Sequence, residues 1–206
     1  MSRYTGPKGK IVRRFGVNVF GHPKYDRLLS DRPNAPGQHG QMKGRRKISE
    51  YGLQLIEKQK LKFAYGVREK QFRLYYKRAL AQTGITGDNM LILLETRLDN
   101  VIYRLGMAPS RDAARQAILH GHIKVNGRRV NVPSFQVRTG DEVTVKANQR
   151  SQSLIRRYLE ENANREVPEW LIVNKDQLKG SIARKPIREE IPTIANEQLV
   201  VELFSK

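Results

Sequence analysis

The sequence predicts an α+β fold in which a basic, extended N-terminal arm and a helical domain are followed by an inserted module, a helix pair packed on a small, mainly antiparallel sheet. Two observations predict this architecture. Between residues 49 and 121 the apolar residues recur at steps of three and four, which is the period of an amphipathic helix. Beyond residue 121 they alternate with polar residues, and Asn126-Gly127 supplies a strong hairpin signal.

The charge of the chain indicates its kind of partner. Its 206 residues include 39 Lys and Arg against 20 Asp and Glu, a formal charge of +19. Residues 1–50 hold 12 basic and 3 acidic side chains, whereas residues 147–206 hold 10 and 9. A uniformly solvated surface would spread its charge evenly, so the gradient favours directed contact with a polyanion and disfavours a free-standing metabolic enzyme.

Nucleic acid is a better candidate for that polyanion than a membrane surface. The longest apolar cluster, residues 90–94, is far shorter than the roughly 20 residues that span a bilayer, so we expect no membrane partner. No apolar stretch follows the basic N-terminus, so it does not resemble a secretory signal. The chain has no Cys, which excludes disulfides and a thiolate zinc site. We expect a cytoplasmic protein, with an organellar stroma or matrix left open.

Residues 1–48 form the predicted arm. Gly and Pro interrupt it repeatedly, no helical or strand period is visible, and basic clusters occur at residues 13–14 and 45–47. Such a segment buries too little apolar surface to offset its ordering entropy, so we expect it to become fully ordered only against a partner. Its aromatic residues, including Phe15 and Phe20, argue against a simple solvating tail.

Residues 49–93 form the predicted helical domain. A first helix runs from Ser49 to Gly66, and a second carries Phe72, Tyr75 and Tyr76 on one face. Because this aromatic stripe has a complete helical period, it indicates a packed core rather than a platform for stacking bases.

Residues 94–157 form the predicted inserted module. Asp88 is a plausible N-cap for a helix that reaches Gly106, and Ser110 caps a second helix on which Arg111 and Arg115 project together. Guanidinium forks suit phosphate oxygens, so this Arg pair is a candidate RNA contact. Strands are expected around residues 123–125, 130–132 and 142–145.

The remaining residues, 158–206, are expected to complete the scaffold with the end of an amphipathic helix and two short strands, near residues 170–173 and 199–204.

Two further arginines of the inserted module, Arg129 and Arg138, are interpreted as solvated surface charges.

Two long segments carry a family resemblance. Residues 95–106, ETRLDNVIYRLG, and residues 110–127, SRDAARQAILHGHIKVNG, resemble the RNA-binding domain of the ribosomal S-four family. The resemblance continues in the opening RYTGP, in PGQHG at residues 36–40, in YGLQL from Tyr51 and in NEQLVVEL from Asn196. The resemblance thus covers nearly the whole chain. The family members that the chain resembles are the bacterial or organellar small-subunit proteins.

The resemblance implies a structural protein of the small ribosomal subunit. It implies binding to a five-way junction in the 5′ domain of the small-subunit ribosomal RNA, early nucleation of assembly and a contribution to translational accuracy. It also implies ribosomal proteins S-three and S-five as neighbours at the messenger RNA entry channel, with residues 43–47 as the basic stretch facing the messenger.

The chain departs from the family at its metal site. Many members carry four Cys in the arm, but Gly9 and Val12 stand where the first pair would be. The four His residues lack further ligands in suitable spacing, so we expect no metal and no cofactor.

The candidate RNA-contacting residues are basic, polar and aromatic side chains spread over the arm, the helices and the module. They are Arg3, Lys8, Arg13, Arg14, Lys43, Arg45, Arg46, Lys47, Tyr51, Lys58, Lys60, Arg73, Arg97, Arg104, Ser110, Arg111, Arg115, His120, His122, Lys124, Asn126 and Arg128.

Two alternatives use the same RNA-binding module: an RNA-modifying enzyme, and a free RNA chaperone or translational repressor. The acidic pairs at residues 160–161 and 189–190 lie in polar contexts, so no catalytic residue is predicted. The roughly 60 residues after the module are also too few for a separate catalytic domain. We rank the ribosomal interpretation first, the enzyme second and the free RNA binder third.

Overall fold

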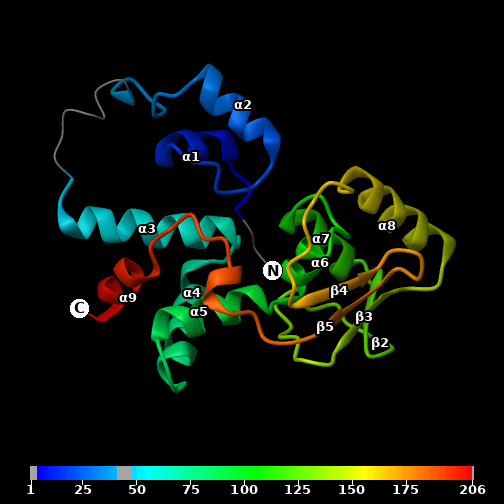
Figure 1. The fold of residues 1–206 in the computed structure, drawn as a ribbon. Coiled ribbons are helices and arrows are strands. Elements are labelled where there is room, and N and C mark those ends of the chain that lie inside the picture. The colour runs from blue at the N-terminus through cyan, green and yellow to red at the C-terminus, as the bar shows by residue number, and fades with distance from the viewer. Residues whose placement is uncertain (1–3, 41–47, 206) are drawn as a thin grey trace. The chain divides into compact units, whose positions relative to one another are not determined.

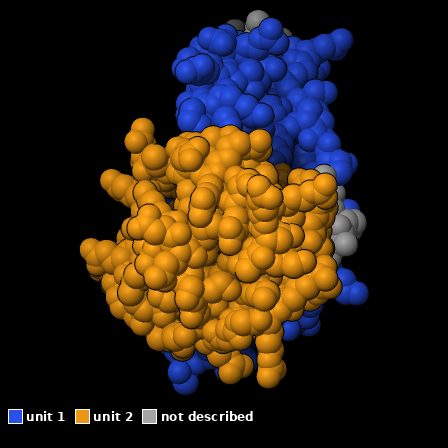
Figure 2. All heavy atoms as spheres, turned by 90° about the vertical axis from the view of Figure 1, so that its right-hand side faces the viewer, with its two compact units in different colours: residues 1–87, 192–206 blue, residues 88–191 orange. Residues whose placement is uncertain are grey.

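A computed structural model describes residues 4–40 and 48–205 (Figure 1). The chain divides into two compact units, which Figure 2 distinguishes by colour. Unit 1 comprises residues 1–87 and 192–206, and unit 2 comprises residues 88–191. Helix α5 (Thr86–Glu95) runs across the point in the sequence where the assignment changes.

Unit 1 begins with two helices in the segment expected to be extended. They are α1 (Lys8–Phe15) and α2 (Pro23–Asp31), so the prediction of an extended arm is wrong at these residues. Ile11 and Val12 of α1 pack with Val19 and Tyr25 in a small core that Phe63 also contacts. The sequence pattern misses these helices because each is about two turns long and buries too few residues to show a helical period.

Two longer helices follow in unit 1. Helices α3 (Glu50–Ala64) and α4 (Glu69–Leu80) match the two predicted helices, and Phe72, Tyr75 and Tyr76 are buried as the aromatic stripe predicted. This confirms that the stripe belongs to the core.

The chain returns to unit 1 at its C-terminal end. Residues 199–204, expected as a strand, belong instead to helix α9 (Glu197–Ser205), which packs on α3 (Figure 1). The run is almost continuously apolar, so its pattern does not distinguish a buried helix from a strand. In the structure the Phe204 ring lies 4.7 Å from the Tyr76 ring, and Gln54 donates a hydrogen bond to Glu202 at 3.1 Å.

Unit 2 packs helices on one antiparallel sheet, which confirms the predicted α+β class. The helices are α6 (Leu98–Arg104), α7 (Arg111–Leu119) and α8 (Gln149–Glu161), and a 3-10 turn, η2, covers Arg188–Glu190. The strands are β1 (Ile123–Val125), β2 (Arg128–Arg129), β3 (Glu142–Val145), β4 (Leu171–Asn174) and β5 (Lys179–Ile182), in the order β2-β1-β3-β5-β4.

The first hairpin is close to its prediction. Asn126 and Gly127 have φ values of 48° and 74°, as a tight turn with two left-handed residues requires. The return strand is shorter than expected, because β2 covers only Arg128–Arg129 and does not reach residues 130–132. Strands β3 and β4 fall where alternation placed them, but β5 has no apolar alternation and was not predicted.

The core of unit 2 lies between the helices and one face of the sheet. Trp170, Leu98, Ile102, Ile118 and Val143 are among its fully buried side chains.

In the described part of the chain no helix is both long and apolar enough to cross a bilayer.

The predicted helix from Asp88 to Gly106 is broken in two. It begins earlier, at Thr86, and α5 ends at Glu95 before α6 starts at Leu98. At the break Arg97 is extended and bridges to Gln136, while the amide of Leu98 donates to the Phe135 carbonyl. Hydrogen bonds to the segment at Phe135 and Gln136 thus replace those that a continuous helix would make.

Gly180 of β5 faces this core, and we predict that a larger residue there destabilises unit 2. A Cβ atom at this position would lie 2.5 Å from Leu105 Cδ1, and Leu105 is only 1% exposed. We expect Gly180→Ala to lower the free energy of unfolding by about 1–3 kcal/mol, measured by urea denaturation. Ser181→Ala on the opposite face of β5 is the control, and an equal loss in both variants would contradict the proposed close packing.

Candidate nucleic-acid interface

The break between α5 and α6 is the centre of a buried network of charges. Asp99 is 1% exposed and accepts two hydrogen bonds from Arg97, at 3.0 Å from Nε and 2.7 Å from Nη2. Arg115 of α7 donates to the same carboxylate from Nε at 2.7 Å. One buried carboxylate therefore orients two guanidinium groups from separate segments through charge-assisted hydrogen bonds, which are stronger than neutral ones.

A second buried carboxylate repeats the arrangement at the end of α5. Glu95 is also 1% exposed and accepts from Arg104 Nε at 3.0 Å and from Nη2 at 2.7 Å. The Asn100 side-chain amide donates to Glu95 Oε2 at 2.6 Å. Among the described residues every buried side-chain nitrogen and oxygen has a hydrogen-bond partner, so this charged cluster is satisfied internally.

Arg111 connects the network to an aromatic ring. Its Nε donates to Asn100 Oδ1 at 2.8 Å, and its guanidinium carbon lies 4.5 Å from the centre of the Tyr103 ring. Arg165 contacts the same ring at 4.3 Å and donates from Nη1 to the carbonyl of Ala108 at 3.0 Å. Burial lowers the pKa of Arg165 below its ordinary value. Tyr103 thus holds two guanidinium groups by cation–π contact.

This network bears on four of the candidate residues. Arg97, Arg104, Arg111 and Arg115 are held by carboxylate or amide groups of the protein itself. Removing the charge of Arg115 would therefore disturb the fold, because the side chain is only 11% exposed and is bound to the buried Asp99.

Candidate residues lie at both ends of α7: Ser110 precedes the helix, and His120 and His122 form the junction that follows it. Ser110 caps α7 by accepting from the Ala113 amide at 3.2 Å. His122 Nδ1 lies 2.8 Å from the Ser151 hydroxyl, while His120 is exposed. Burial, with His120 and Lys146 nearby, lowers the pKa of His122 and so favours its neutral imidazole.

The hairpin after this junction carries three cations that are unpaired among the described residues. Asn126 holds the turn in place, donating to Asp141 at 2.8 Å and accepting from the Glu142 amide at 2.8 Å. Lys124, Arg128 and Arg129, by contrast, form no side-chain hydrogen bond or ion pair with any residue that the structure describes. They remain available to an external anion.

In unit 1, as in unit 2, some candidate residues are paired within the protein and others are exposed. Lys58 is buried and contacts Glu69 at 2.6 Å, and Lys60 contacts Glu57 at 2.6 Å. The Lys58–Glu69 pair joins α3 to α4, whereas Lys60 and Glu57 lie three residues apart on α3. The Lys58 and Lys62 ammonium groups lower the pKa of Glu69, although its partial burial acts in the opposite direction.

Other candidates in unit 1 are more accessible. Tyr51 is 60% exposed, and Arg73 has a 67% exposed side chain that lies 3.7 Å from Glu69. On α1, Lys8 lies over the Phe20 ring at 4.9 Å and Arg13 donates to the Asn34 carbonyl at 2.9 Å. Arg14, on the same helix, is exposed. Arg3, Lys43, Arg45, Arg46 and Lys47 lie outside the described residues.

The described His residues have local structural partners or are exposed. His22 accepts from the Lys24 amide at 3.2 Å and so caps α2. Within residues 4–40 and 48–205 no three His, Asp or Glu side chains gather closely enough to hold a metal ion.

Sequence reasoning missed two kinds of functional side chain. The first is the carboxylates Glu95 and Asp99, which orient the arginines; their spacing around Arg97 is a local signal that could have indicated ion pairing. The second is Arg165, whose contact with Tyr103 joins residues 62 positions apart and leaves no local pattern.

The fold and its exposed cations define a class: a protein built around a helix-and-sheet module of the S4 type. Residues 96–143 match the S4 domain, and residues 3–95 match the Ribosomal protein S4/S9 N-terminal domain. The Small ribosomal subunit protein uS4 of Borrelia turicatae is 54% identical over 207 aligned positions, which cover 100% of this chain and 99% of that protein. That of Akkermansia muciniphila is 52% identical and both chains are covered completely. The chain belongs to the uS4 family of small ribosomal subunit proteins.

We predict that the buried network is essential for the stability of unit 2. Asp99→Asn keeps the shape of the side chain but leaves Arg97 and Arg115 without their carboxylate, so we expect a loss of about 3–5 kcal/mol in unfolding free energy, measured by urea denaturation.

Asp112→Asn is the matched control for that variant. Asp112 also faces Arg115, but at 3.7 Å and with a side chain that is 32% exposed, so its loss should stay below about 1 kcal/mol. Similar losses in the two variants would show that the buried pair has no special role.

Proposed function

We propose that this chain is a structural, RNA-binding constituent of the small ribosomal subunit and not an enzyme. The observation that carries the proposal is the match to small ribosomal subunit proteins over the whole length of the chain. The charge of +19 supports the same conclusion, because an excess of this size favours a polyanionic partner.

The division of charges in unit 2 supports binding rather than catalysis. Its deeply buried carboxylates, Glu95 and Asp99, are saturated by arginines and an amide, so they are not free to transfer protons. The cations of the first hairpin, in contrast, are unpaired with any described residue. Exposed cations on a rigid scaffold suit phosphate contacts, which position a protein on RNA.

Within the small subunit, we propose that the ligand is a multi-helix junction in the 5′ domain of the ribosomal RNA. Double-helical RNA has a deep, narrow major groove that side chains do not read, so recognition of a junction depends on its shape, phosphates and 2′-hydroxyls. A broad basic surface fits that requirement. Binding of this kind early in assembly would nucleate the body of the subunit in the ribosomes of the cytoplasm.

The same proposal extends to neighbours. The family resemblance suggests ribosomal proteins S-three and S-five beside this chain, messenger RNA at the entry channel and an effect on translational accuracy. The basic residues assigned to the messenger contact, Lys43 and residues 45–47, lie outside the described part of the chain.

A salt titration tests the RNA-binding function. We expect the association constant of the full chain for a 5′ domain transcript to fall steeply with salt, by about 10³- to 10⁵-fold between 50 and 200 mM if six to ten phosphates are contacted. A scrambled transcript of equal length is the control and should bind more weakly at each salt concentration. Salt-independent binding, or equal affinity for both transcripts, would overturn the proposal.

A further inference from the structure

The sheet of unit 2 has a second face, opposite the core, that carries a row of polar side chains. Lys124 of β1 is paired with Arg129 of β2 on one side and with Thr144 of β3 on the other. Thr144 is paired with Lys179 of β5, which is paired with Asn174 of β4. Because residues in register lie on the same face of a sheet, these five side chains form one row across all five strands.

One end of this row carries two cations that have no partner in the part of the chain that the structure describes. Lys124 and Arg129 form no ion pair with any described residue, and the Arg129 guanidinium lies over the backbone of Gly121, which has no side chain to displace it. Lys179, near the other end, is paired with Glu142 at 3.0 Å, and both side chains are 46% exposed. The row is therefore most basic along β1 and β2.

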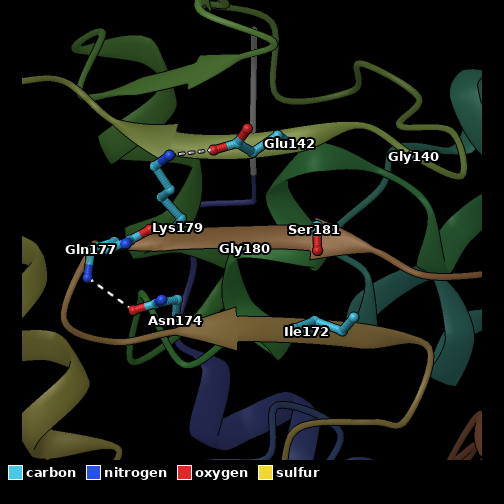
Figure 3. A pocket seen from close by; sticks show the side chains of 8 residues that line it. All are labelled: Gly140, Glu142, Ile172, Asn174, Gln177, Lys179, Gly180 and Ser181. Atoms are coloured by element: carbon cyan, nitrogen blue, oxygen red, sulfur yellow. Dashed lines mark hydrogen bonds and ion pairs between the residues drawn. The ribbon is translucent and has the colours of Figure 1, made fainter.

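The other end of the row borders an open groove of about 360 Å³ over β3, β5 and β4 (Figure 3). Its lining combines hydroxyl, amide and charged groups, including Ser181, Asn174 and Lys179, with the apolar side chain of Ile172, which is 58% exposed. The groove thus offers hydrogen-bonding groups beside one apolar surface, which suits a sugar or a base edge.

We propose that this outer face of the sheet is a second RNA-contacting surface of unit 2, across which a sugar-phosphate backbone runs along the row. Arg129 and Lys124 contact phosphates, and the groove at β5 and β4 accommodates the sugar or base that follows. The proposal rests on the proposed RNA-binding function. Arg129 is then a phosphate contact, whereas the sequence alone favoured a solvated surface charge at this position.

Charge and composition favour RNA over a protein segment as the occupant. Protein interfaces concentrate their binding energy in buried aromatic and apolar anchors. The row contains no aromatic residue, and Ile172 is the one large apolar side chain that lines the groove. Unpaired cations beside hydroxyl and amide groups instead match the contacts that proteins make to phosphates and sugars.

The test compares two double variants of the full-length chain. Lys124→Gln with Arg129→Gln removes the unpaired cations of the row. Arg150→Gln with Arg156→Gln removes the same charge from exposed positions of α8, whose buried residues, Ser151, Ile155 and Leu159, lie on the opposite side of that helix. Both should unfold at the same urea concentration as the unaltered chain, because none of the four side chains has a described partner.

For binding to the 5′ domain transcript, we expect the row variant to lose about 10- to 30-fold in affinity at 0.15 M salt, and its salt slope to fall by about 1.4–1.8, as two lost phosphate contacts require. The α8 variant should lose markedly less. If the two variants lose equally, bulk charge explains the effect and the proposal fails. If the unaltered chain binds with a steep salt dependence and the row variant binds identically, the proposal fails while the proposed function stands.

Cross-linking identifies the occupant directly. A photo-reactive amino acid placed at position 172 of the full-length chain, incorporated into small subunits, should cross-link to ribosomal RNA. Cross-links to a ribosomal protein alone, or to neither partner, would overturn the RNA assignment of this face.

Discussion

The stability of unit 2 depends on two buried carboxylates at a break between helices. Glu95 and Asp99 are almost completely removed from solvent, and burying a charge is costly unless it is paired and fully hydrogen-bonded. Three arginines, from the break, from α6 and from α7, meet that requirement. The pairing fixes how α6 and α7 pack on each other, and these two helices in turn support the sheet and its exposed hairpin.

This arrangement separates the cations of the module into two groups with different tasks. Arginines that face the carboxylates stabilise the fold, whereas Lys124, Arg128 and Arg129 remain unpaired among the described residues, Lys124 half-buried and the two arginines exposed. A phosphate backbone can be contacted by side chains of the second group without breaking any internal ion pair. Rigid support of that kind lowers the entropic cost of binding, because the contacting strand is already ordered before RNA arrives.

Much of the architecture could be predicted because it depends on local patterns. Helical periods located α3, α4 and α7, and Asn126-Gly127 located the hairpin. The errors have physical causes: α1 and α2 are too short to show a period, α9 is apolar enough to resemble a strand, and β5 has a glycine where the core requires a small residue. For the site, residue type alone indicated which side chains can bind phosphate. It did not indicate which of them the protein binds itself: Asp99 is close to Arg97 in sequence, but it lies 16 residues from Arg115, and Asn100 lies 11 residues from Arg111.

The most direct test of this account is the exchange of the arginine Nε–H protons with water, measured by NMR on the free protein and on its complex with RNA. The account predicts slow exchange for Arg97, Arg104 and Arg115 in the free protein, with little change on adding RNA, because these protons are already bound to buried carboxylates. It predicts rapid exchange for Arg128 and Arg129 in the free protein and protection in the complex. Equally rapid exchange of all five protons in the free protein would contradict it.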